Sequence, residues 1–124
     1  MLLNLDLRSS MPIYEQIKLG ILGKILNGEL KRDDVLPSIR ELASILRVNP
    51  NTVIRAYKEL EIEGILIARQ GIGFLVNAEI QTTRGIFMAV LQKELLEPIR
   101  KAKRSGIELE EIIEVVKELW KNTE

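Results

Sequence analysis

The sequence predicts a mainly α-helical protein with a small β-hairpin, in which an N-terminal domain is followed by two C-terminal α-helices. Two observations lead to this fold class. Apolar residues recur at helical spacing before residue 64 and again after residue 82, and the segment between them holds two β-type runs around a Gly-x-Gly turn. We therefore expect an N-terminal domain over residues 1–78 and a helical tail over residues 79–124.

Composition limits the function classes. With 124 residues the chain fits one domain, or a small domain with an appendage. Hydrophobic residues make up 46% and aromatic residues only 4%, so the core must be built from Leu, Ile and Val. The 18 Lys and Arg balance the 18 Asp and Glu, which argues against bulk electrostatic adhesion to nucleic acid or acidic membranes. A local basic face stays compatible with this balance.

The chain contains neither cysteine nor histidine. Disulfides and thiolate metal sites are therefore excluded, and the usual general base and commonest metal ligand are missing. We expect no enzyme activity, no cofactor and no bound metal. The first ten residues lack the basic and apolar regions of a signal peptide, and no segment reads as a membrane span, so we expect a cytoplasmic protein.

The first predicted helix covers residues 11–27, where isoleucine recurs every fourth residue from Ile13 to Ile25. Pro12 suits its first turn and Gly28 its end. Two glycines inside this helix, Gly20 and Gly23, cost about 1 kcal/mol each relative to alanine. Close packing against another helix would explain them.

Two short helices joined by a tight turn are predicted next. A charged connector over residues 29–36 ends in a short extended piece, and Ser38 with Glu41 forms a capping box for a helix over residues 38–46. Asn49 caps the following helix and Pro50 fits its first position. The apolar set of this helix repeats at i, i+3, i+4 and i+7 and consists of Val53, Ala56, Tyr57 and Leu60. This order describes a helix-turn-helix.

A β-hairpin directly after a helix-turn-helix is a wing. The runs 65–67 and 74–76 are β-type, and residues 69–73 read as the hairpin tip. Beyond it, residues 84–104 and 108–121 carry further helical patterns. Pro98 is expected to kink the first of these helices or to mark a break in it.

The start of the second helix of a helix-turn-helix reaches base edges in the major groove of DNA. The outward set here is Asn51, Thr52, Arg55 and Lys58. Asn suits adenine and Arg suits guanine through bidentate hydrogen bonds, whereas Lys58 would reach a phosphate. Ile54 points partly outward, where a thymine methyl group could meet it.

Two further contact layers are predicted. The helix N-terminus after Ser38 attracts phosphate, and Arg40 lies in the same turn. At the wing tip, Gly71 permits close approach, and Arg69 and Gln70 can enter the minor groove or hold phosphate.

Each feature also has a purely structural explanation. Ser38 caps a helix, the glycines serve turn geometry, and Arg55 and Lys58 could pair with the acids of their own helix as a solvated face. The order of the elements is more specific than any of them.

Residues 1–78 carry ten basic and nine acidic side chains. The face toward DNA must therefore be locally basic, with Glu59, Glu61 and Glu63 toward the far end of the helix.

These residues resemble the GntR family of bacterial winged-helix transcription regulators. The resemblance covers roughly residues 11–77 and rests on the motifs Ile13-Tyr14-x-Gln16-Ile17, Leu36-Pro37-Ser38-x-Arg40-Glu41-Leu42-Ala43, Val48-Asn49-Pro50-Asn51-Thr52-Val53-x-Arg55-Ala56-Tyr57 and Gln70-Gly71-x-Gly73-Phe74-x-Val76. The motif Val-Asn-Pro-Asn-Thr at residues 48–52 and the short tail resemble the YtrA subfamily. Relatives often carry Arg at the position of Ile54.

The resemblance implies a repressor that binds a palindromic operator in double-stranded DNA as a homodimer joined by its C-terminal helices. It implies DNA contacts by Ser38, Arg40, Asn51, Thr52, Arg55, Gln70 and Gly71, and control of a transporter operon, beside which such regulators often lie. Whether a small-molecule effector binds stays open, since no third domain is predicted. The alternative function is a winged-helix module for protein–protein interaction without DNA binding.

Overall fold

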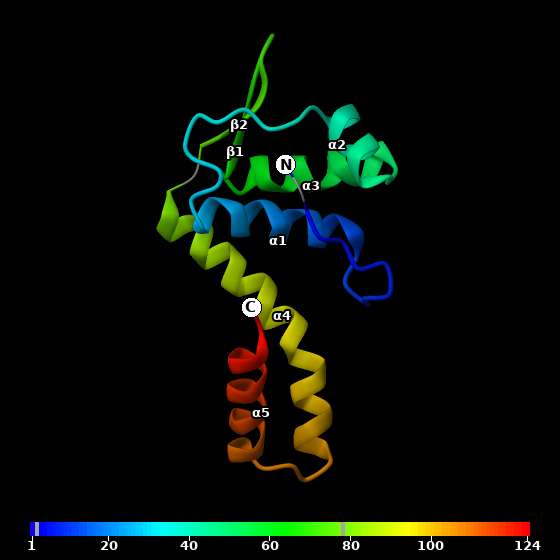
Figure 1. The fold of residues 1–124 in the computed structure, drawn as a ribbon, viewed down its shortest axis with the longest axis vertical. Coiled ribbons are helices and arrows are strands. Elements are labelled where there is room, and N and C mark those ends of the chain that lie inside the picture. The colour runs from blue at the N-terminus through cyan, green and yellow to red at the C-terminus, as the bar shows by residue number, and fades with distance from the viewer. Residues whose placement is uncertain (2, 78) are drawn as a thin grey trace. The chain divides into compact units, whose positions relative to one another are not determined.

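The computed structural model describes residues 1, 3–77 and 79–124, and it confirms the predicted fold class (Figure 1). The helices and strands follow one another as α1 (Ile13–Leu26), α2 (Ile39–Leu46), α3 (Pro50–Ile62), β1 (Leu66–Arg69), β2 (Gly73–Val76), α4 (Ile80–Arg104) and α5 (Leu109–Asn122).

Contacts between Cα atoms divide the chain into two compact units, Met1–Val90 and Leu91–Glu124. The first unit includes the opening turns of α4, where Thr83 and Val90 are buried. Residue 78, at which the predicted division between the winged domain and the tail falls, lies outside the described residues. That functional division stays a prediction.

The helix-turn-helix forms as its capping residues predict. Ser38 Oγ accepts a hydrogen bond from the Glu41 amide at 3.1 Å, and Glu41 Oε1 accepts one from the Ser38 amide at the same distance, which closes the capping box. Arg47 ends α2 in the left-handed conformation, with φ of 56°. Asn49 Oδ1 then accepts a hydrogen bond from the Asn51 amide, and Pro50 opens α3. The turn between the helices is fixed by local chemistry at both ends.

The wing is an antiparallel hairpin of β1 and β2 whose register pairs Leu66 with Val76. In Figure 1 the hairpin tip extends away from α1, α2 and α3. The connector before α2 pairs with the free edge of β2. The Leu36 amide donates to the Phe74 carbonyl at 2.9 Å, and Val35 forms a β-bridge with Leu75. The short extended piece predicted at the end of this connector is thus part of the wing.

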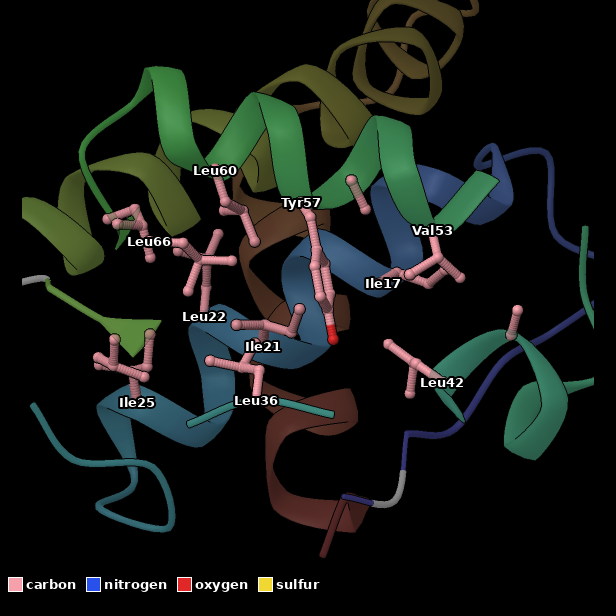
Figure 2. Packing of buried hydrophobic residues seen from close by; sticks show 14 residues of the cluster. Ile17, Ile21, Leu22, Ile25, Leu36, Leu42, Val53, Tyr57, Leu60 and Leu66 are labelled. Carbon is pink, nitrogen blue, oxygen red and sulfur yellow. The ribbon is translucent and has the colours of Figure 1, made fainter. Parts of the chain in front are cut away.

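The core of the first unit is aliphatic around one tyrosine (Figure 2). Tyr57 is completely buried, and its side chain points from α3 into the cluster. Its hydroxyl donates to the Pro37 carbonyl at 2.7 Å, and its ring meets Phe74 edge-on at 5.1 Å. Burial, and then the nearby charge of Glu41, raise the pKa of Tyr57. Tyr57 therefore ties α3 to the segment that leads into α2 and to the wing.

Replacing Tyr57 by phenylalanine should lower the free energy of unfolding by about 1 kcal/mol, because the Pro37 carbonyl loses its buried donor. Urea unfolding would measure the loss. Tyr14→Phe is the matched control, since no hydrogen bond joins the Tyr14 hydroxyl to any described residue, and it should unfold like the parent. Equal losses for the two variants would contradict the role assigned to the Tyr57 hydroxyl.

The glycines of α1 have two different neighbours, which corrects one prediction. A Cβ at Gly20 would lie 2.6 Å from Leu3 Cδ2, so the N-terminal segment, and not a helix, occupies the space that this glycine leaves. Gln16 fastens the same segment by hydrogen bonds between its amide group and the backbone of Asp6. At Gly23 the nearest side chain is Phe87 of α4, at 3.9 Å, as packing against a helix requires.

Pro98 lies inside α4, which continues to Arg104, so of the two predicted outcomes, a kink or a break, the break does not occur. Helix α4 also begins earlier than predicted, at Ile80. A turn at Gly106 leads to α5, none of whose residues is buried. Among the described residues, no helix is both long and apolar enough to cross a membrane.

Candidate nucleic-acid interface

The outward side of α3 carries the four side chains predicted to face DNA. Asn51, Arg55 and Lys58 are exposed and Thr52 is half-buried. The opposite side of the helix is completely buried, at Val53, Ala56, Tyr57 and Leu60. With a rise of about 1.5 Å per residue, Asn51 and Arg55 lie about 6 Å apart along the axis. The four side chains thus form one polar stripe that begins in the first turn of α3 and extends just past its middle.

Arg55 and Lys58 are both engaged within the protein, as the structural explanation foresaw. Arg55 Nε lies 3.1 Å from Glu59 Oε2, and its guanidinium carbon lies 3.7 Å from the centre of the Tyr14 ring. Lys58 Nζ lies 3.5 Å from Glu61 Oε1 and 5.8 Å from the centre of the Phe74 ring. Both basic side chains are still largely exposed, at 61% for Arg55 and 58% for Lys58. Both cations therefore keep much of their surface accessible to a ligand.

A buried lysine of α1 pairs with two acids at the C-terminal end of α3. Lys18 of α1 is 7% exposed, and its Nζ lies 3.0 Å from Glu59 Oε1 and 2.7 Å from Glu63 Oε1. Burial disfavours the ammonium form, but hydrogen bonds and charges from Glu63 and Glu59 outweigh it and raise the pKa of Lys18. The pKa of Glu59 is lowered for the converse reason: burial opposes its charge, and Lys18 and Arg55 outweigh that cost. Two of the three acids predicted toward the far end of this helix, Glu59 and Glu63, are thus held by a buried cation.

The N-terminus of α2 presents a second exposed group. Ser38 and Arg40 are both exposed, and the capping box occupies the Ser38 and Glu41 amides. Hydrogen bonds from the Ser38 backbone and then from its side chain lower the pKa of Glu41. In the part of the chain that the structure describes, no acceptor outside the helix meets the amides of Ile39 and Arg40. These two amides are among the first N–H groups of the helix, which have no acceptor within it.

The wing tip presents the third group, which consists of the exposed residues Arg69, Gln70 and Gly71. Gly71 has φ of 79° and Gly73 has φ of 120°, so both occupy backbone conformations that side chains other than glycine rarely adopt. Ile72 between them is 60% exposed. The turn geometry accounts for both glycines, and it leaves Arg69 and Gln70 on an unobstructed tip.

The structure therefore distributes the nine predicted residues over three exposed elements: the start of α2, the outward side of α3 and the wing tip. Sequence reasoning missed two residues of α1, Tyr14 and Lys18, that hold Arg55 and Glu59. A signal was present, because Lys18 lies one helical turn from both Tyr14 and Leu22, and a lysine within an apolar stripe indicates a buried ion pair. Among residues 1, 3–77 and 79–124, no cluster of acidic side chains suits a metal ion.

Several known proteins are similar to this chain in sequence or in structure. Residues 13–76 match the family described as "Bacterial regulatory proteins, gntR family". The chain is 43% identical over 120 residues to the "HTH-type transcriptional repressor YtrA" of Bacillus subtilis, which is 95% of this chain and 92% of that protein.

Two solved structures are similar as well. A GntR family transcriptional regulator from Listeria monocytogenes shares 37% identity and a TM-score of 0.68, over 89% of this chain and 96% of its own. The AraR DNA-binding domain, solved in complex with operator ORR3, shares 29% identity and a TM-score of 0.50, over 61% of this chain and 94% of its own.

Proposed function

Since this chain belongs to the GntR family of bacterial regulatory proteins and is a DNA-binding transcription regulator of the YtrA type, we propose that it represses transcription as a homodimer bound to a palindromic operator. The observation that carries the proposal is the polar stripe of α3, which is exposed on one side while the other side is locked into the core. A helix anchored in this way can enter the major groove without distorting the domain.

The three exposed groups take different roles in this proposal. Asn51, Thr52 and Arg55 read base edges, and Lys58 binds a phosphate. Ser38 and Arg40 bind a phosphate at the N-terminus of α2. The wing-tip residues Arg69, Gln70 and Gly71 contact the minor groove or the adjoining backbone. The similar AraR domain, which was solved on its operator, supports this use of the fold.

Homodimerisation is supported by the second unit, whose helices lack a core of their own. Large apolar side chains of α5 are left exposed, at 62% for Leu119 and 83% for Trp120. An apolar pocket of about 550 Å³ lies at the turn between the helices, next to Ile99 and Ile112. Apolar surface of this extent on helices without a core is typical of an oligomer interface. A two-fold dimer would place two copies of α3 about one turn of DNA apart.

The function is tested by footprinting on the promoter of the operon that encodes the protein. Protection of two inverted half-sites whose centres are about 10 base pairs apart, or a multiple of that spacing, would support the proposal. We expect this operon to encode a transporter, as is often the case for regulators of this type. A chain that shifts no promoter fragment in a gel would instead be an interaction module without a DNA role.

Replacing Arg55 by alanine should weaken specific binding by about 1–3 kcal/mol and relax the preference at one base pair. Lys58→Ala is the contrasting variant. It should weaken binding to all sequences alike and reduce the slope of log affinity against log salt by about 1, since it removes one phosphate contact. Fluorescence anisotropy on the mapped operator at several salt concentrations distinguishes the two. Parental affinity for Arg55→Ala would show that Arg55 does not read a base.

A further inference from the structure

The Arg55 side chain is held on two sides before any DNA is present. The Tyr14 ring of α1 covers one face of the guanidinium at 3.7 Å, and Glu59 accepts the Nε–H at 3.1 Å. No described residue forms a hydrogen bond with Nη1 or Nη2. The edge that remains is the pair of terminal nitrogens, which can form the two parallel hydrogen bonds to O6 and N7 of guanine.

Glu59 can hold Arg55 because it is itself fixed. Its other oxygen, Oε1, accepts a hydrogen bond from Lys18 at 3.0 Å, and Lys18 is buried and anchored a second time by Glu63 at 2.7 Å. Lys18 lies one helical turn after Tyr14 on α1. The orientation of Arg55 on α3 is therefore imposed from a neighbouring helix, through one aromatic contact and one bridging carboxylate.

We propose that Tyr14 and Glu59 are positioning residues for Arg55, which preorder its guanidinium so that Nη1 and Nη2 meet a guanine in the operator. This inference rests on the proposed function, because it assumes that Arg55 reads a base. Neither residue needs to touch DNA. Their contribution is to remove rotamers of a long side chain before binding, so that less conformational freedom is lost when the base is contacted.

Lys58 provides an internal comparison on the same helix. Its ion pair with Glu61 is longer, at 3.5 Å, and its aromatic neighbour Phe74 is 5.8 Å away. Glu61 is bound by no buried lysine among the described residues. A loosely held ammonium suits a phosphate, which is recognised as a point charge, whereas a guanine requires an oriented fork.

The experiment uses the full chain and its mapped operator, with each guanine of a half-site replaced in turn. Arg55→Ala first identifies the guanine whose replacement no longer matters. At that position Tyr14→Leu should reduce the discrimination between the parent and the replaced base by about 3- to 10-fold, as expected when one side chain is released. Tyr14→Phe, which keeps the ring, should discriminate like the parent. Thermal unfolding verifies that each variant is folded.

A double-mutant cycle separates positioning from a general effect on structure. If Tyr14 acts through Arg55, then Tyr14→Leu should change nothing further in an Arg55→Ala background. Glu59→Gln should lower discrimination at the same guanine. Glu61→Gln, which removes the same charge from the same helix, should raise affinity for all DNA sequences equally and leave discrimination unchanged.

Two results would overturn the positioning role and leave the proposed function standing. One is an equal effect of Tyr14→Leu with and without Arg55. The other is tighter specific binding by Tyr14→Leu, which would mean that the ring withholds Arg55 from DNA. Parental binding by Arg55→Ala overturns the base-reading role in the proposed function and the positioning role together. The binding of the Arg55→Ala variant by itself therefore tells the two failures apart.

Discussion

Replacing Lys18 by methionine should lower the free energy of unfolding by about 2–3 kcal/mol. The lysine side chain is 7% exposed and lies between Glu59 and Glu63, which are 33% and 29% exposed. Methionine fills a similar volume but leaves Glu63 without its cation, and Glu59 with only the exposed Arg55, in a partly desolvated place. Because water still reaches the carboxylates, the expected loss is below the roughly 3–5 kcal/mol found when a fully enclosed pair is broken. Urea unfolding near neutral pH would measure it.

The loss should depend on pH in a defined direction. Folding lowers the pKa of Glu59 from its ordinary value of 4.5, so its contribution is present above that pH and is lost as the pH falls through the lowered value. Folding raises the pKa of Lys18 from 10.5, so its contribution is present below that pH and is lost in stronger alkali. The difference between the parent and Lys18→Met should therefore be largest between these limits and should shrink in acid below pH 4.5.

Lys24→Met is the matched control, because it makes the same change in the same helix. Lys24 also forms a short ion pair, at 2.7 Å, but its partner Glu29 is 58% exposed and stays solvated when the lysine is removed. The expected loss is below about 1 kcal/mol. Equal losses for the two variants would show that burial of Lys18 adds nothing to the pair.

The parts of the fold that could be predicted are those with local causes. Ser38 with Glu41, and Asn49 with Pro50, mark the starts of two helices within a few residues, and the structure reproduces both caps. The buried side of α3 follows from a spacing of three and four residues and is confirmed at Val53 and its partners. Such features need no knowledge of the rest of the chain.

The features that escaped prediction depend on segments distant in sequence. Gly20 faces Leu3, a residue of the N-terminal segment that carries no helical or β-type pattern, so its neighbour could not be inferred from α1 alone. Lys18 reaches Glu59 across 41 positions. Periodicity predicted which side of α3 is exposed, but only the packing of α1 against α3 shows that Tyr14 lies against Arg55 and Lys18 against Glu59.

Replacing Leu119 by lysine should convert the proposed homodimer into a monomer at micromolar concentration and weaken operator binding about 100-fold or more. In a single protomer Leu119 is 62% exposed, so the change costs little for folding. In a dimer joined by the α5 faces, it would bury an unpaired ammonium from each protomer. Operator affinity then falls because a dimer gains 10²–10⁴-fold, in order of magnitude, from binding its second half-site as one molecule.

Glu118→Lys separates this loss from a change of charge. The position is adjacent, exposed and polar, and the variant adds more positive charge than Leu119→Lys does, so it should stay dimeric and bind operator at least as tightly as the parent. Sedimentation reports the mass, and Trp120, the single tryptophan and 83% exposed in the protomer, reports burial through its fluorescence. If Leu119→Lys stays dimeric with parental affinity, the dimer interface must lie elsewhere, since an unpaired charge in a dry apolar interface cannot be neutral in free energy.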